Sequence, residues 1–358
     1  MSGSPPIPEG ALYAIDLYPE RVDFERLALV FCRMTRETYR RSPFLDHRIE
    51  RAPGEGLILP FDAFDAQLEL PVRPVSHAIF HGAFCCSTLL SRYIDALNRN
   101  LVLREPHALY ELLVLRLMQG TGALPDVPPE RIATLLSLVR YLLGRRADPD
   151  QPVVIKHTDG CNIAMIELLS RPNTGRGLFM WSSLERFLAA ILKFPHRRQW
   201  VYVRLQELMV AWQRREGRLP VDPRVVKPHQ AVALLWILQM ENLEHTLATL
   251  PTGTLVTLDA QTFLADPVSA LQQVMCHFDT PVEPGQIEER LSDIDFGRHS
   301  KSTLEAYDSD RRDDDFRTAR MAFAAEIDAA VDWAGNVLER DWREYRPPAP
   351  LDSKNSTG

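Results

Sequence analysis

The chain has 358 residues, of which 45% are hydrophobic and 25% are charged, a composition typical of globular proteins and unlike that of disordered or fibrous ones. Its 41 basic and 48 acidic residues give a net charge of −7, which excludes a general basic field for holding nucleic acid or an anionic membrane surface. Any anionic ligand must therefore be bound by a local group of donors. We expect no nucleic-acid partner, and the sequence indicates no oligomeric state.

The cysteines and the N-terminus indicate a cytoplasmic protein. An odd number of cysteines without a CxxC pair favours a reducing compartment and predicts neither a disulfide framework nor a metal site. The first ten residues, MSGSPPIPEG, lack an apolar signal region. No run approaches the roughly 18 apolar residues that a membrane span needs, so we expect no span.

The chain shows no internal repeat and no long Gly/Ser linker. We therefore predict one α/β domain over residues 11–345, with a disordered N-terminus at residues 1–10 and a disordered C-terminal tail at residues 346–358. The charged stretch at residues 308–315 is interpreted as a solvated loop.

In chain order, the first predicted element is a helix over residues 22–39, where apolar residues lie beside arginines. Residues 75–84 predict a buried strand entering a tight turn, and residues 87–97 have the start and the period of a helix. Further strands are predicted over residues 101–104, 152–156, 177–181 and 253–258, and further helices over residues 108–118, 130–144, 184–193 and 231–250. This alternation predicts a mostly parallel central sheet flanked by helices, with ligands bound at the carboxyl ends of the strands.

The turn between the first predicted strand of this sheet and its helix is a candidate anion site. A helix that begins at Ser87 points backbone N–H groups and the positive end of its dipole into the turn. The hydroxyls of Ser87 and Thr88 add two donors for a phosphate. The alternative is that these two side chains only cap the helix.

The residues of this turn resemble a known family. Residues 80–90, FHGAFCCSTLL, are similar to the 5′-phosphosulfate loop of sulfotransferases, whose pattern runs roughly G-x-P-[RK]-[ST]-G-[ST]-T-L-L. Four further segments resemble family blocks and follow in the family's order, at residues 103–106, 154–156, 258–278 and 296–301. The resemblance implies a three-layer P-loop-like fold.

The resemblance also implies transfer of a sulfuryl group from 3′-phosphoadenosine 5′-phosphosulfate (PAPS) to a hydroxyl or amine, without a metal. Lys156 then supplies charge at the leaving oxygen, and Glu105 or a nearby histidine, His81, accepts the proton of the acceptor. The implied PAPS contacts are Cys85, Cys86, Ser87 and Thr88 at the 5′-phosphosulfate and Arg298 and Lys301 at the 3′-phosphate.

The chain departs from the family pattern at four positions. Phe84 stands where the loop carries Lys or Arg, and Cys86 stands where it carries glycine. Trp181 and Ala189 stand where an arginine and a serine bind the 3′-phosphate. Three arginines are candidates to replace the lost cations, namely Arg92, Arg104 and Arg186.

Three alternatives therefore stay open, and one of them is a nonenzymatic interaction scaffold that has kept the fold. A divergent or noncatalytic member of the fold would bind another phosphorylated ligand. A nucleotide phosphotransferase is disfavoured, because the sequence contains no G-x-x-x-x-G-K-[ST] motif. The pair Cys85–Cys86 is interpreted as small packed side chains in preference to a redox or nucleophilic site.

Overall fold

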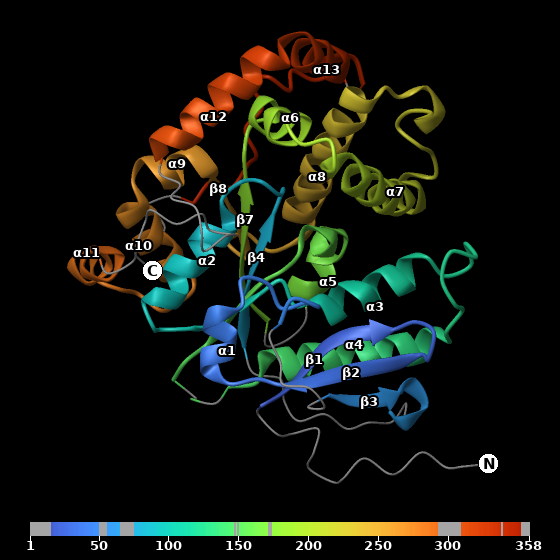
Figure 1. Cartoon of the computed structure of the whole chain (residues 1–358), viewed down its shortest axis with the longest axis vertical. Helices are drawn as coiled ribbons and strands as arrows, with labels where there is room; N and C mark the ends of the chain where they lie inside the picture. Colours follow the sequence, from blue (N-terminus) through green and yellow to red (C-terminus); the bar gives the residue numbers. More distant parts are fainter. Residues whose placement is uncertain are drawn as a thin grey trace.

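The computed structural model describes residues 16–49, 56–64, 75–146, 148, 150–170, 174–292, 309–337 and 339–351. Figure 1 shows a central sheet with helices on both sides and a smaller sheet beneath it. The five strands of the central sheet are β4 (Ser76–His81), β5 (Leu101–Arg104), β6 (Val153–Lys156), β7 (Thr174–Trp181) and β8 (Leu255–Asp259).

The strand order is β5-β6-β4-β7-β8, and every neighbouring pair is parallel. The predicted α/β architecture with a mostly parallel sheet flanked by helices is confirmed. Since β4 lies between β6 and β7, its carboxyl end at His81 is in the middle of the sheet edge where ligands of such folds bind.

Two hydrophobic clusters fix the layers, because neighbouring residues of a strand point to opposite faces. Ile79 of β4 joins the cluster on one face, and Phe80 joins the cluster on the other. The helices on the Ile79 face are α2 (Ser87–Ala96), α9 (Ala260–Ala265), α10 (Pro267–His277) and α11 (Pro284–Ser292). The Phe80 cluster includes residues of α3 (His107–Leu117), α4 (Pro129–Gly144), α5 (Met165–Ser170), α6 (Leu184–Leu192), α7 (Arg197–Glu216), α8 (Pro228–Thr249) and α13 (Ala324–Val337).

The predicted helix over residues 22–39 is wrong. This region contains the end of β1 (Leu17–Asp23) and all of β2 (Ala28–Arg33), which form a three-stranded antiparallel sheet with β3 (Leu57–Pro60). The short helix α1 (Arg36–Arg41) follows β2. The chain turns at Leu27, which has φ 48°. The apolar run after it is buried continuously from Ala28 to Cys32, so it carries no alternation that distinguishes a strand from a buried helix. β1 packs against α3 and α4.

The C-terminal part is more ordered than its composition suggests. Residues 309–315, expected in a solvated loop, belong to the helix α12 (Ser309–Ala322), which packs on α6. Residues 346–351, expected in a disordered tail, run beside β8, where the Thr257 N–H donates to Ala349 O and the Leu351 N–H donates to Thr257 O, both at 2.8 Å. Backbone hydrogen bonds to a strand edge thus order a segment that lacks periodicity.

Three short 3-10 helices complete the described elements, η2 (Phe61–Ala63), η3 (Asp159–Ala164) and η4 (Pro223–Val225). Of these, η3 follows β6 directly and brings Asp159 to the carboxyl edge of the sheet. None of the described helices combines the length and the hydrophobicity that crossing a membrane requires.

Candidate active site

The turn between β4 and α2 is held in an uncommon backbone conformation. Ala83, Phe84 and Cys86 have φ of 61°, 52° and 69°, in the left-handed region. A residue with a Cβ costs roughly 1–2 kcal/mol in that region, and such strain concentrates at functional sites. We call residues 82–88, which comprise this turn and the start of α2, the cradle.

The helix start in the cradle is not capped by a side chain. Cys86 is the N-cap residue of α2 and makes no capping hydrogen bond with its side chain. Ser87 and Thr88 are buried in the first turn, so their hydroxyls do not act as N-caps. The N–H groups and the positive end of the α2 dipole therefore face the turn, which suits an anion.

The two cysteines of the cradle lie in different environments. Cys85 is fully buried, and its Sγ donates to the Met180 carbonyl oxygen at 3.1 Å. Burial raises the pKa of the Cys85 thiol to about 12, so it is a neutral packed group at pH 7 and not a nucleophile. Cys86 is half-buried and touches Arg312 of α12.

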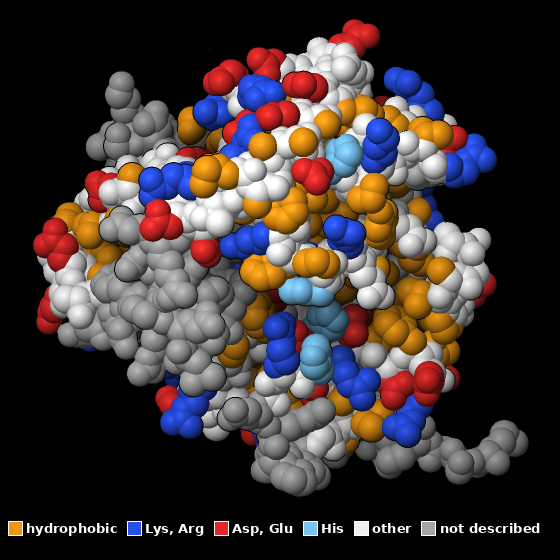
Figure 2. All heavy atoms as spheres, turned by 45° about the horizontal axis from the view of Figure 1, so that its top comes forward, with side chains coloured by type: hydrophobic (Ala, Val, Ile, Leu, Met, Phe, Trp, Pro, Cys, Tyr) orange, Lys and Arg blue, Asp and Glu red, His pale blue; other side chains and the backbone are white. Residues whose placement is uncertain are grey.

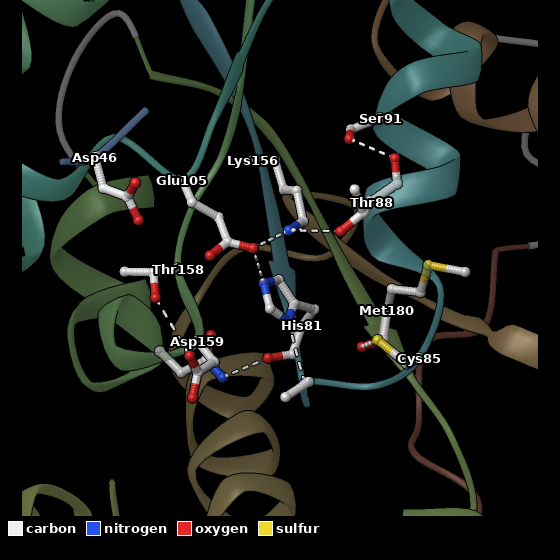
Figure 3. A network of polar contacts seen from close by, with 12 residues as sticks. Asp46, His81, Cys85, Thr88, Ser91, Glu105, Lys156, Thr158, Asp159 and Met180 are labelled. Atoms are coloured by element: carbon white, nitrogen blue, oxygen red, sulfur yellow. Dashed lines mark hydrogen bonds and ion pairs between the residues drawn. The ribbon is translucent and has the colours of Figure 1, made fainter. Parts of the chain in front are cut away.

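Lys156, Glu105 and His81 meet at the carboxyl edge of the sheet. They come from the ends of β6, β5 and β4, which are adjacent strands. The Lys156 ammonium forms an ion pair with Glu105 Oε1 and lies 3.5 Å from Thr88 Oγ1 in the cradle. Figure 3 shows Glu105 between the other two side chains. We call these three residues the ion-pair cluster; it joins the cradle through Thr88.

Burial and backbone geometry hold the ion-pair cluster in place. The Lys156 side chain is 1% exposed, whereas that of Glu105 is 19% exposed. Glu105 has φ 55°, and its N–H donates to the Lys156 carbonyl oxygen at 2.6 Å. The Glu105 carboxylate is thus the member of the cluster that a bound molecule can reach.

His81 is oriented by the cradle itself. Its Nδ1 accepts a hydrogen bond from the Ala83 N–H at 3.1 Å, which assigns the ring proton to Nε2. Nε2 lies 3.7 Å from Glu105 Oε1, so its N–H faces the carboxylate. His81 therefore lies beside Glu105, at a distance longer than a hydrogen bond.

A second pair of titratable groups follows Glu105, and sequence reasoning missed it. His107 Nε2 lies 3.5 Å from Glu111 Oε1 on α3, and Glu111 Oε2 accepts a hydrogen bond from the Val22 N–H at 2.5 Å. Burial raises the pKa of Glu111 to about 7 and lowers that of His107. The signal in the sequence is the histidine two residues after Glu105.

A buried arginine network joins α7 to the start of η3. Asp159 at the start of η3 accepts from Arg204 Nε of α7 at 3.0 Å, and Arg204 also pairs with Glu207 at 3.0 Å. Burial alone would lower the pKa of Arg204, but the two carboxylates raise it. Thr158 Oγ1 lies 3.2 Å from Asp159 Oδ1 (Figure 3). The network fixes α7 against the carboxyl end of β6.

Two of the three arginines expected to replace the missing loop cation have other roles. Arg104 is 2% exposed and donates to the carbonyl oxygens of Tyr39, Arg40 and Ser42, so it is structural. Arg186 pairs with Asp313 at 3.1 Å. Arg92 lies on α2 and is half-buried.

Two other arginines stand at the departures from the family pattern. The Arg197 guanidinium of α7 stacks over the Phe84 ring at 4.3 Å and over the Phe194 ring at 4.1 Å. Arg312 contacts Cys86. Because α7 and α12 are far from the cradle in sequence, only the tertiary structure places these two cations.

The other predicted positions are placed as follows. Trp181 ends β7 and is buried, with the Arg346 guanidinium 5.9 Å from its ring, and Ala189 is buried in α6. Arg298 and Lys301 lie outside the described residues. No group of three or more His, Cys, Asp or Glu side chains able to hold a metal ion occurs in the described part of the chain.

The surface over the strand ends is hollowed. Figure 2 brings forward the side of Figure 1 toward which β7 runs, and shows histidine side chains gathered in a hollow between Lys/Arg and Asp/Glu side chains. Glu105 and His107 are partly exposed, with side-chain exposures of 19% and 32%. The arrangement combines an anion cradle, a buried ammonium and a reachable carboxylate.

No protein-family model matches the sequence, and no curated protein matches it. Among solved structures, it is similar to the sulfotransferase domain from the curacin biosynthetic pathway, with 14% identity, a TM-score of 0.38 and coverage of 78% of this chain and 94% of that chain. It is also similar to a sulfotransferase from Alicyclobacillus acidocaldarius, with 13% identity, a TM-score of 0.36 and coverage of 76% of this chain and 100% of that chain. A third similar structure is retinol dehydratase in complex with androsterone and inactive cofactor PAP, with 12% identity, a TM-score of 0.38 and coverage of 78% of this chain and 84% of that chain. At these TM-scores the likeness identifies neither a family nor an activity.

Proposed function

We propose that this protein is a sulfotransferase that moves a sulfuryl group from PAPS to a hydroxyl or amine acceptor. The observation that carries the proposal is the contact between two halves of one site: the Lys156 ammonium reaches both Thr88 of the uncapped cradle and the Glu105 carboxylate. Sulfuryl transfer needs cationic or N–H donors beside a sulfated phosphate and a base beside the acceptor. The resemblance of residues 80–90 to the phosphosulfate loop supports the same assignment.

The cradle fits the phosphosulfate end of PAPS. The first N–H groups of α2, with no side-chain cap, and the hydroxyls of Ser87 and Thr88 are donors for it, and the backbone at Cys85 and Cys86 shapes the turn. Arg298 and Lys301 are proposed at the 3′-phosphate. When bound, PAPS supplies an activated sulfuryl group, which leaves its phosphate oxygen as it bonds to the acceptor.

The ion-pair cluster performs the proton transfer in this proposal. Glu105 accepts the proton of the acceptor hydroxyl or amine, and the His81 Nε2–H faces the carboxylate from 3.7 Å. As Glu105 becomes neutral, its attraction for the Lys156 ammonium weakens. The ammonium charge is then available on the Thr88 side, where negative charge develops on the leaving oxygen.

A ligand titration tests the cofactor. We expect 3′,5′-adenosine bisphosphate (PAP) and PAPS to raise the thermal unfolding midpoint, because a ligand at 100 times its Kd stabilises a protein by about 2.7 kcal/mol. Adenosine 5′-phosphate, which lacks the 3′-phosphate, is the matched control and should act more weakly. If PAP and PAPS have no effect at millimolar concentration, the proposal is wrong.

The activity itself is read as release of PAP from PAPS in the presence of a panel of alcohols, phenols and amines. We expect Lys156→Ala to lower that rate by about 10²–10³-fold, the usual loss for a group that stabilises transition-state charge. The fold of the variant is checked by circular dichroism. Normal turnover by a folded Lys156→Ala protein would remove Lys156 from the mechanism.

A second candidate is a protein of the same fold that binds another phosphorylated ligand. The replacement of the loop cation and glycine by Phe84 and Cys86 favours it. ATP and ADP are therefore included in the titration. A shift with these nucleotides but none with PAP would support this second candidate. We also propose a cytoplasmic, reducing location, since no disulfide joins any of the five cysteines, all of which are described.

A further inference from the structure

The α12 helix brings a guanidinium to the cradle. Arg312 lies in the first turns of α12, and its Nη2 donates to the Cys86 Sγ atom at the N-cap of α2. The two residues are 226 positions apart in the sequence. The contact therefore places a cation from the C-terminal part of the chain beside the start of α2.

Ion pairs hold α12 in this position. Asp313 pairs with Arg186 at 3.1 Å and Asp315 pairs with Lys193 at 3.3 Å, and both cations belong to α6 or its C-terminal end. Arg317 pairs with Asp314 on α12 itself. Among the described residues, in contrast, Arg312 contacts the thiol and forms no ion pair with a carboxylate.

The Arg312 guanidinium and the positive end of the α2 dipole lie close together at the cradle. A helix N-terminus carries roughly +0.5 of an elementary charge, and the Arg312 guanidinium adds a full positive charge next to it. A thiol is a weak acceptor, whereas a guanidinium offers five N–H donors. An anion between the helix start and the guanidinium removes this repulsion and uses both sets of donors.

We infer that Arg312 is a ligand of the anion bound in the cradle, and that it supplies the cation which the loop lacks at Phe84. The anion is of the phosphate class, since a guanidinium fork and a helix N-terminus both match tetrahedral oxyanions. The inference deepens the proposed function and rests on it for the identity of the nucleotide. It does not depend on sulfuryl transfer itself.

The test compares anion binding by variants at two arginine positions of the same helix. Calorimetric titrations with PAP and with inorganic phosphate are run on the wild type, Arg312→Ala, Arg312→Lys and the control Arg317→Ala. Arg317 is 67% exposed and carries the same charge on the same helix. We expect Arg312→Ala to weaken binding about 10- to 100-fold. Arg312→Lys should lose less than about tenfold, and Arg317→Ala should stay within about twofold.

The Cys86 thiol gives a second readout that needs no variant. Its alkylation by iodoacetamide, followed by mass spectrometry, should slow when PAP occupies the cradle, because Cys86 lies against Arg312. This readout applies even if Arg312→Ala does not fold. If PAP binds without slowing alkylation of Cys86, the inference is overturned.

The outcomes separate the two proposals. If Arg312→Ala binds PAP as tightly as the wild type, the role of Arg312 is refuted while the proposed function stands. If the wild type binds phosphate but not PAP, the proposed function fails, and the phosphate titrations of the variants still decide the role of Arg312. If the wild type binds neither, both are overturned.

Discussion

The cradle and the ion-pair cluster lie in contact, but backbone conformation defines the cradle and side-chain charges define the cluster. The cradle is a backbone structure, in which Ala83, Phe84 and Cys86 hold left-handed conformations. The ion-pair cluster is a side-chain structure, in which a buried ammonium depends on one carboxylate. The free energy of unfolding should therefore be more sensitive to substitutions in the cluster than to substitutions in the cradle.

Loss of Lys156 should have the largest effect on stability. Lys156→Ala leaves the partly buried Glu105 without its ammonium, and removing one partner of a buried pair costs about 3–5 kcal/mol. Since Glu105 retains some exposure, we expect the lower end of that range. Urea unfolding measures the change.

Two variants sharpen this prediction. In Lys156→Met with Glu105→Gln, no charge remains unpaired, so most of the lost stability should return. Lys193→Ala breaks a surface pair with Asp315 and should cost less than about 1 kcal/mol. If the double variant is no more stable than Lys156→Ala, the ion pair is not what the single substitution disrupts.

The pair beside the cluster should make stability depend on pH, with a smaller effect. The Glu111 pKa of about 7 lies above its ordinary value of 4.5, so the folded protein holds a proton that the unfolded chain releases. The contribution of this proton to the free energy of unfolding is fully present below pH 4.5 and is lost as the pH rises from 4.5 through 7. Glu111→Gln cannot ionise, and should be more stable than the wild type at pH 8 by up to about 3 kcal/mol.

At pH 5 the two proteins should differ little, because Glu111 is then protonated in the fold. The wild type and Glu111→Gln should respond alike to acid. Burial lowers the pKa of His77 to about 4, so both proteins lose stability as the pH falls from 6.5 through 4. Unfolding midpoints measured from pH 4 to 9 check this. A stability difference independent of pH would contradict the assignment to Glu111 ionisation.

The smallest predicted effect concerns the cradle. Ala83→Gly removes a methyl group and adds backbone entropy to the unfolded chain, but it also relieves a left-handed Ala, so we expect a change within about 0.5 kcal/mol. Ala133→Gly at an exposed position inside α4 is the matched control and should cost about 1 kcal/mol. Equal costs at the two positions would show that Ala83 is not strained.

The sequence alone predicted the parallel sheet and three residues of the ion-pair cluster. Short apolar runs separated by longer helical patterns are sufficient to predict β4 to β8, and parallel strands bring their carboxyl ends to one edge. That rule places His81, Glu105 and Lys156 near one another, because each of them stands at or just after the end of a predicted strand. Hydrophobic pattern does not predict the structure of residues 22–39, because a continuous apolar run fits both a buried helix and a buried strand.

Only the tertiary structure decided which cations reach the cradle. Arg92, Arg104 and Arg186 were the expected replacements for the loop cation, whereas the folded chain places Arg197 over Phe84 and Arg312 against Cys86. The physical reason is that the hydrophobic pattern of a segment reflects which of its own residues are buried. Which distant side chain contacts the segment depends instead on how separate helices pack against each other. The strand–turn–helix was therefore predictable from its own residues, and the charge that faces it was not.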